Sequence, residues 1–159
     1  MLIAAGLGLS VLLAALPAAG EEPRYGPRAW QDPVSGLAIG GYDPLTYFTH
    51  AKPLRGRSKY EHVWGGAVWQ FVNSGNRDAF KRDPAVYAPA FAGYDPYSLS
   101  LGRTTPGEPT IWARYRNRIY FFSSGVHLRL WREGPEQVIE KAGKQWAVLS
   151  RTLPSSLGY

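Results

Sequence analysis

The chain has 159 residues, no cysteine and a formal net charge of +6 at pH 7. The lack of cysteine excludes disulfides, thiolate-bound metals, thiol nucleophiles and iron–sulfur clusters. Lys and Arg are scattered rather than gathered in runs, which argues against a nucleic-acid partner and leaves an envelope protein or a membrane surface as candidate partners.

The first twenty residues, 1–20 (MLIAAGLGLSVLLAALPAAG), contain no charged side chain and end in small residues. This pattern is typical of a signal peptide cut before Glu21 and predicts a periplasmic or secreted protein. An uncleaved membrane anchor is the alternative, although Pro17 weakens it because a spanning helix needs ~20 unbroken apolar residues. Residues 21–36 are rich in Pro and Gly, so we expect a flexible N-terminal arm.

Residues 60–71 (YEHVWGGAVWQF) predict a tight β-hairpin with the two adjacent glycines as its turn. Pairing the strands across this turn places His62 opposite Trp69 and Tyr60 opposite Phe71. Side chains alternate between the two faces of a strand, so all four are expected on one aromatic face that carries a single imidazole.

Helix-start signals, namely Asp, Asn or Ser near a Pro or a helix former, recur along the chain. We expect one folded domain over residues 37–151, followed by a frayed tail at residues 152–159. The expected elements are helical segments at 45–49, 74–82, 84–87, after Pro96, at 125–132 and at 135–150, and a second hairpin formed by 111–115 and 118–122.

The second hairpin and its helix repeat the first when the chain is shifted by 51 residues, which places Phe80 on Trp131 and Pro84 on Pro135. His62 has no imidazole counterpart in the second copy, which is a mild argument for a local role. We predict an α+β fold: a small single domain of two β-hairpin–helix (ββα) units around a shared aromatic core, with a C-terminal helix.

Four segments together resemble the YHS domain family, in particular its exported bacterial members. They are GGYDPLTYF at 40–48, YEHVWGGAVWQF at 60–71, NRDAFKRDPAVYAP at 76–89 and AGYDPY at 92–97. The resemblance implies a small α+β domain with a metal- or ligand-binding role, in which His62 occupies the family's histidine. Asp95 stands where many relatives carry cysteine or selenocysteine, so no thiolate or selenolate redox role is implied for this chain.

Imidazole and carboxylates together suit a divalent metal ion. We therefore expect His62, Asp95 and Asp43 as candidate metal ligands. The alternative for each Asp is a helix cap, and the alternative for His62 is a ring packed on Trp69 and hydrogen-bonded to a carbonyl or a Tyr hydroxyl. The candidate ligand-binding residues beside these positions are Tyr42, Tyr60, Trp69 and Tyr94.

Two interpretations of function remain open. The first is an exported, non-enzymatic binding module with a metal-ion or small-ligand site near His62, since the sequence carries no strong nucleophile motif and no phosphate-binding loop. The second is a structural or protein-interaction domain that uses an exposed aromatic patch of Trp112, Phe121 and Trp30. A small-molecule enzyme with His62 as general base is a third, minor interpretation.

Overall fold

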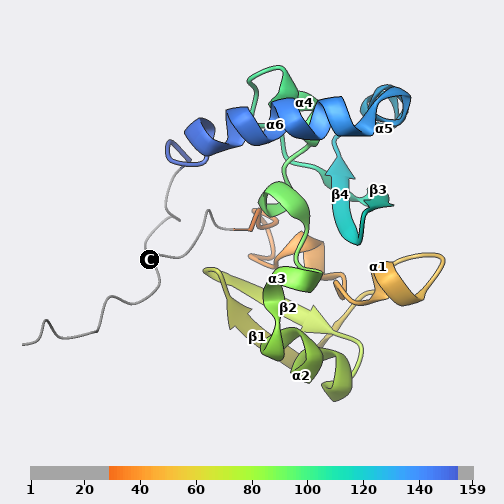
Figure 1. The fold of residues 1–159 in the computed structure, drawn as a ribbon. Coiled ribbons are helices and arrows are strands. Elements are labelled where there is room, and N and C mark those ends of the chain that lie inside the picture. The colour runs from red at the N-terminus through yellow and green to blue at the C-terminus, as the bar shows by residue number, and fades with distance from the viewer. Residues whose placement is uncertain (1–28, 154–159) are drawn as a thin grey trace, which may run out of the picture.

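Two β-hairpin–helix units follow one another along the chain and stack into one domain in the computed structural model, which describes residues 29–153 (Figure 1). The predicted signal peptide and most of the predicted tail lie outside the described residues. The first unit consists of η1 (Ile39–Gly41), α1 (Thr46–Thr49), β1 (Arg57–Trp64), β2 (Ala67–Phe71), α2 (Ser74–Arg82) and α3 (Pro84–Tyr87). The second consists of η2 (Ala90–Gly93), α4 (Pro96–Ser100), β3 (Glu108–Tyr115), β4 (Arg118–Phe122), α5 (Gly125–Glu133) and α6 (Pro135–Leu149).

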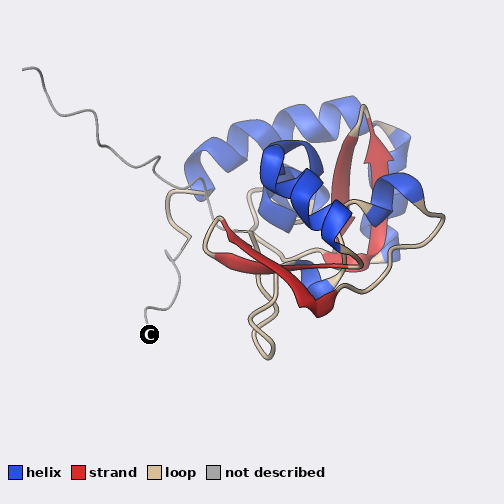
Figure 2. Ribbon diagram, turned by 90° about the horizontal axis from the view of Figure 1, so that it is seen from below, coloured by secondary structure: helices blue, strands red, loops and turns tan. Residues whose placement is uncertain are grey.

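The hairpins form two separate two-stranded antiparallel sheets rather than one continuous sheet (Figure 2). His62 pairs with Trp69 as predicted, because the turn fixes the register close to it. The predicted pairing of Tyr60 with Phe71 is wrong: the register shifts within β1, and Arg57 faces Phe71 instead. Arg57 and Glu61 are four residues apart in β1, whereas their partners Phe71 and Gln70 are adjacent in β2, so the pairing is irregular between these two positions.

The second unit repeats the first in backbone detail, including the register irregularity of its hairpin. A glycine precedes each hairpin and ties it to the helical turn before it. The N–H of Gly56 donates to Gly41 O (2.8 Å), and the N–H of Gly107 donates to Gly93 O (2.9 Å). The predicted α+β fold of two ββα units with a C-terminal helix is confirmed.

The larger aromatic core belongs to both units. In the first unit Trp69 packs on Phe80 of α2, with ring centroids 4.8 Å apart. Phe121 of β4 enters the same cluster and lies 5.2 Å from the ring of Tyr47. The hydroxyl of Tyr47 donates to Pro109 O (2.9 Å) and adds a polar bond across the junction. The second hairpin therefore completes the core of the first unit.

A second, smaller core lies on the other face of the second hairpin, so this hairpin is covered on both sides. Trp131 of α5 packs there on Tyr120 and Phe122, and α6 contributes Val138 and Ile139. The α6 helix also packs along α4. None of the helices formed by residues 29–153 is long and apolar enough to cross a membrane.

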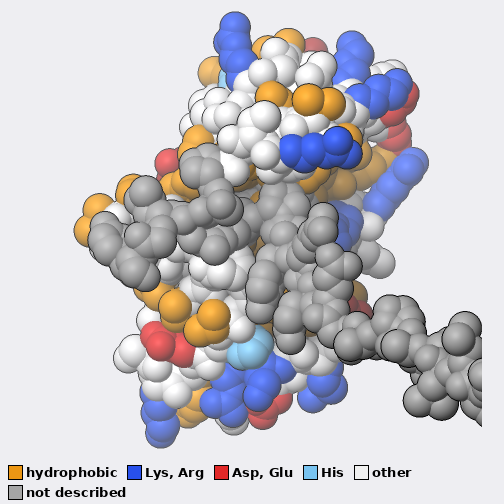
Figure 3. All heavy atoms as spheres, turned by 90° about the vertical axis from the view of Figure 1, so that its left-hand side faces the viewer, with side chains coloured by type: hydrophobic (Ala, Val, Ile, Leu, Met, Phe, Trp, Pro, Cys, Tyr) orange, Lys and Arg blue, Asp and Glu red, His pale blue; other side chains and the backbone are white. Residues whose placement is uncertain are grey.

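The last residues of the expected flexible arm are part of the folded domain. Ala29 is buried, the N–H of Trp30 donates to Ala92 O (2.7 Å), and Gln31 forms a bridge with Ala38. Lys and Arg side chains occur at both ends of the face shown in Figure 3, in line with their scatter in the sequence.

Gly66→Val is expected to lower the free energy of unfolding by about 2 kcal/mol, because Gly65 (φ 57°) and Gly66 (φ 73°) form a primed hairpin turn that a β-branched residue resists. The matched control is Gly66→Asn, since Asn117 adopts φ 57° in the equivalent turn of the second unit. Chemical denaturation measures both variants. Equal stability of the Val and Asn variants would contradict the turn assignment.

Candidate functional site

His62 lies on the aromatic face of the first hairpin and is half-buried. Its ring packs edge-on against Phe80, with ring centroids 6.4 Å apart. Burial lowers the pKa of His62 below its ordinary value, and the charges of Lys81 and Arg77 lower it further. The same environment opposes a bound metal cation, since both desolvation and nearby positive charge disfavour it.

Asp43 is fully buried and uses both carboxylate oxygens inside the first unit. Its Oδ1 accepts from the N–H of Leu45 (2.9 Å). Its Oδ2 accepts from the N–H of Val72 (2.9 Å) and from Nδ2 of Asn76 (2.7 Å). This carboxylate therefore joins the start of α1 to the end of the hairpin and the first turn of α2, which is a structural role.

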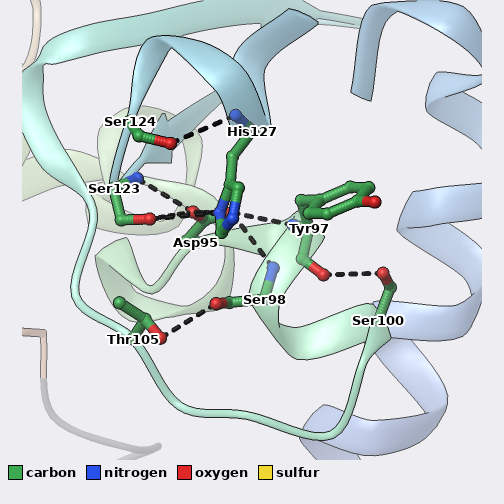
Figure 4. A network of polar contacts seen from close by, with 8 residues as sticks. All are labelled: Asp95, Tyr97, Ser98, Ser100, Thr105, Ser123, Ser124 and His127. Atoms are coloured by element: carbon green, nitrogen blue, oxygen red, sulfur yellow. Dashed lines mark hydrogen bonds and ion pairs between the residues drawn. The ribbon is translucent and has the colours of Figure 1, made fainter. Parts of the chain in front are cut away.

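Asp95 holds the equivalent place in the second unit and is also fully buried (Figure 4). Its Oδ1 accepts from the N–H groups of Tyr97 (2.8 Å) and Ser98 (3.3 Å), and so caps α4. Its Oδ2 accepts from the N–H (2.9 Å) and hydroxyl (2.6 Å) of Ser123 and contacts Nδ1 of His127 at 2.6 Å. A carboxylate offers about four lone-pair sites, and these donors fill them.

The two units differ at the residues that hold these carboxylates. Val72 and Ser123 both follow their hairpins directly, and Asn76 and His127 both lie in the first turn of the next helix. The second unit therefore has a titratable imidazole where the first has a neutral amide, and a hydroxyl where the first has an apolar side chain.

His127 is held by one ring nitrogen and leaves the other available. An ionised carboxylate only accepts hydrogen bonds, so the contact with Asp95 assigns the proton to Nδ1. Nε2 has no hydrogen-bond partner among residues 29–153, and it is not an enclosed atom. The ring also lies beside that of Tyr97, tilted by 50° with centroids 4.9 Å apart. In the neutral ring Nε2 therefore presents a lone pair.

Ser123, His127 and Asp95 do not form a nucleophilic triad. In such a triad the serine contacts Nε2 and the carboxylate contacts Nδ1. Here the Ser123 hydroxyl donates to Asp95 and lies 3.1 Å from Nδ1, on the same side as the carboxylate. The hydroxyl therefore supports Asp95 and is not activated by the imidazole.

The predicted metal site at His62, Asp95 and Asp43 is not assembled. Each carboxylate is filled by hydrogen bonds within its own unit, and His62 forms no hydrogen bond or ion pair with either of them in the described part of the chain. Nor do residues 29–153 contain any group of three or more His, Asp or Glu side chains that could hold a metal ion. The physical reason is that each Asp is needed to satisfy buried backbone N–H groups.

The predicted ligand-binding aromatics are dispersed as well. Trp69 is fully buried, and its Nε1 donates to Trp64 O (2.9 Å). Tyr42 carries the Arg55 guanidinium over its ring, Tyr60 packs on the first core, and Tyr94 packs on Trp146 of α6. Burial raises the pKa of Tyr94 above its ordinary value. Tyr42, Tyr60 and Trp69 therefore belong to the first core, whereas Tyr94 packs on α6.

The predicted interaction patch is only partly exposed. Phe121 is 1% exposed inside the first core, and Trp112 packs edge-on against Tyr47 with ring centroids 5.1 Å apart. Trp30 is half-buried, and its backbone N–H donates to Ala92 O. The sequence-based expectation assumed a hairpin covered on one face, whereas both faces are packed.

The pairing of Asp95 with His127 was missed from the sequence, where Asp95 was expected near His62. The signal was present in the repeat, because the shift of 51 residues aligns Asn76 with His127. Both residues follow a capping side chain by three positions.

Comparison with protein-family models, with curated proteins and with solved structures finds no match to this chain.

Proposed function

We propose that this chain is an exported, non-enzymatic binding module of the YHS type, and that its site for a metal ion or small ligand centres on Nε2 of His127 rather than on His62. The observation that supports the proposal is the contact of 2.6 Å between the buried Asp95 carboxylate and Nδ1 of His127. Metal-binding histidines commonly donate their second ring N–H to a carboxylate, which fixes the tautomer and makes the ligating nitrogen more basic.

Electrostatics favours His127 over the other two histidines of the chain. His127 is backed by the negative charge of Asp95. His62 is desolvated and faces two basic side chains. His50 is exposed and shares a groove with two arginines. A cation is therefore stabilised at the first position and repelled at the other two.

The site supplies one strong ligand, so the remaining coordination positions belong to water or to groups of a bound molecule. Such an open site predicts weak and exchangeable binding rather than a structural metal centre. Imidazole suits zinc, nickel and copper(II), which makes these ions the probes of choice.

The test is an NMR titration of the protein with zinc or nickel, following the ring protons of His50, His62 and His127 together. We expect His127 to respond at the lowest metal concentration. The matched variant is His127→Asn, which is expected to retain stability within about 1 kcal/mol because Asn76 makes the same bond to Asp43. This variant should lose any metal-induced gain in melting temperature.

Three results would decide against the proposal. A first response at His62 would favour the original sequence-based site. Equal responses at all three histidines would mean non-specific association. No response with any of the ions would end the metal version. The reverse variant Asn76→His provides a gain-of-function check, since it should add a second responding imidazole.

A further inference from the structure

A groove lies between the two units and is lined by residues other than those of the proposed His127 site. Its walls come from α1 and the residues after it, from β3 and from the end of α5, and its volume is about 610 Å³. Figure 1 shows α1 near the β3–β4 hairpin, and residues of both line the groove. A volume of this size suits a small molecule.

The basic side chains that line the groove are two arginines and one histidine. Arg114 and Arg132 reach it from β3 and α5, and His50 reaches it from the segment after α1. No Asp or Glu lines it, and neither arginine has an ion-pair partner within residues 29–153. Arg114 is positioned by a hydrogen bond from its Nη1 to Phe48 O (3.0 Å). This lining favours an oxyanion, which arginine binds through parallel N–H groups.

Most of the remaining wall is aromatic, with Phe48, Trp112 and Trp131 among its residues, and the rest is small side chains of Thr and Ala. Trp131 is 3% exposed, and its Nε1–H is the buried side-chain polar atom that lacks a hydrogen-bond partner in the described structure. Buried N–H groups normally have a partner. The first unit has Phe80 at the equivalent position, so packing of the repeat does not itself require an indole N–H.

We propose that this groove binds a small organic anion, consisting of a carboxylate or phosphate monoester attached to a flat ring. Arg114 and Arg132 hold the oxyanion, and the ring lies against the aromatic wall. Trp131 donates its unpaired N–H to an acceptor atom of the ligand as the side chains adjust around it. The groove lining includes neither His127 nor Asp95, although Trp131 lies one turn after His127 on α5.

The test uses phenyl phosphate as the probe, with binding to the full domain measured by calorimetry and by NMR shifts of the tryptophan indole protons. We expect Arg132→Gln and Arg114→Gln each to weaken binding about tenfold. The matched control is Arg129→Gln, because Arg129 is exposed on the same helix and does not line the groove. Its affinity should stay within about twofold of the native protein, a change that reflects only long-range charge.

A second variant tests the indole separately. Trp131→Phe keeps an aromatic ring and copies the residue of the first unit, so the domain is expected to fold. Binding should weaken severalfold, and in the native protein the Nε1 proton of Trp131 should shift on addition of phenyl phosphate. His127→Asn should leave binding unchanged, which separates this proposal from the previous one.

Several outcomes would overturn the proposal. If inorganic phosphate bound as tightly as phenyl phosphate, the phenyl ring would add no affinity, and the aromatic wall would have no role in recognition. Equal losses in the Arg129→Gln and Arg132→Gln variants would mean attraction to net charge alone. Absence of binding at millimolar probe would show that the groove is not an anion site.

Discussion

Asp43→Ala is expected to lower the free energy of unfolding by about 3 kcal/mol or more, and Asp95→Ala by at least as much. Each substitution removes a buried carboxylate and leaves buried N–H groups without an acceptor, those of Leu45 and Ser98 among them. Asp95 also holds the His127 ring, so its loss releases one more group. Urea denaturation of the purified domain measures these losses.

The same experiment decides whether the carboxylates act by hydrogen bonding or by holding an ion. The losses should be the same with and without a strong chelator, because both carboxylates are filled by protein donors. The control is Asp83→Ala, since Asp83 is exposed and makes no capping bond to α3. Its effect should stay within about 0.5 kcal/mol. Losses that disappear in chelator would restore a metal role for Asp43 or Asp95.

Gly56→Ala is the second substitution with a large expected effect, at about 3 kcal/mol. A Cβ atom at Gly56 would lie 2.5 Å from the backbone nitrogen of Phe71 and closer still to the carbonyl carbon of Gln70. These are backbone atoms of β2, so relief requires the strand to move away from the core. Thermal and chemical unfolding measure the loss.

The repeat supplies a parallel test, and the last helix supplies a control. A Cβ at Gly107 would meet Phe121 Cβ at 2.5 Å, so Gly107→Ala should be comparably destabilising. Gly143 lies in α6 with open space around it, and Gly143→Ala should raise stability by about 0.5–1 kcal/mol through helix propensity. A neutral Gly56→Ala variant would mean that the hairpin does not approach the preceding loop so closely.

Local signals in the sequence predict most of the elements. Asn73 and Ser124 cap α2 and α5 through their side chains, and Pro84 and Pro135 stand at the start of the helices that follow. These effects act over a few residues, so a single sequence is sufficient to place them. The register shift in β1 is different, because it depends on how the two strands pair in the folded domain.

The functional residues are harder to predict because they meet through the tertiary fold. Asp43 and Asp95 are 52 residues apart, whereas the hairpins and helices repeat at 51, so a gapless shift does not align the carboxylates with each other. The one-residue difference hides the correspondence between the Asp43–Asn76 and Asp95–His127 pairs. An alignment that allows this offset pairs Asp43 with Asp95 and Asn76 with His127, and so indicates His127 rather than His62 as the partner of Asp95.

The error in the interaction patch has a simpler physical origin. Residues 119–122 (IYFF) form a continuous apolar run, which is typical of a strand buried on both faces. The structure places Phe121 in the first core and Tyr120 with Phe122 in the second. The alternation of side chains along a strand predicts which of them share a face. It does not predict which face of the hairpin is covered by the rest of the domain.

The position of Phe121 makes the two copies of the duplicated motif an obligate pair. The core of the N-terminal copy includes Phe121 of the C-terminal copy, and the Tyr47 hydroxyl donates to Pro109 O across the same junction. If the polypeptide were cut between residues 88 and 89, the first unit would lose the packing of Phe121 in its core. The second unit would then expose the Phe121 ring to solvent. A substitution that changes the volume of Phe121 therefore requires a compensating change in the residues of the first unit that pack on it, such as Tyr47.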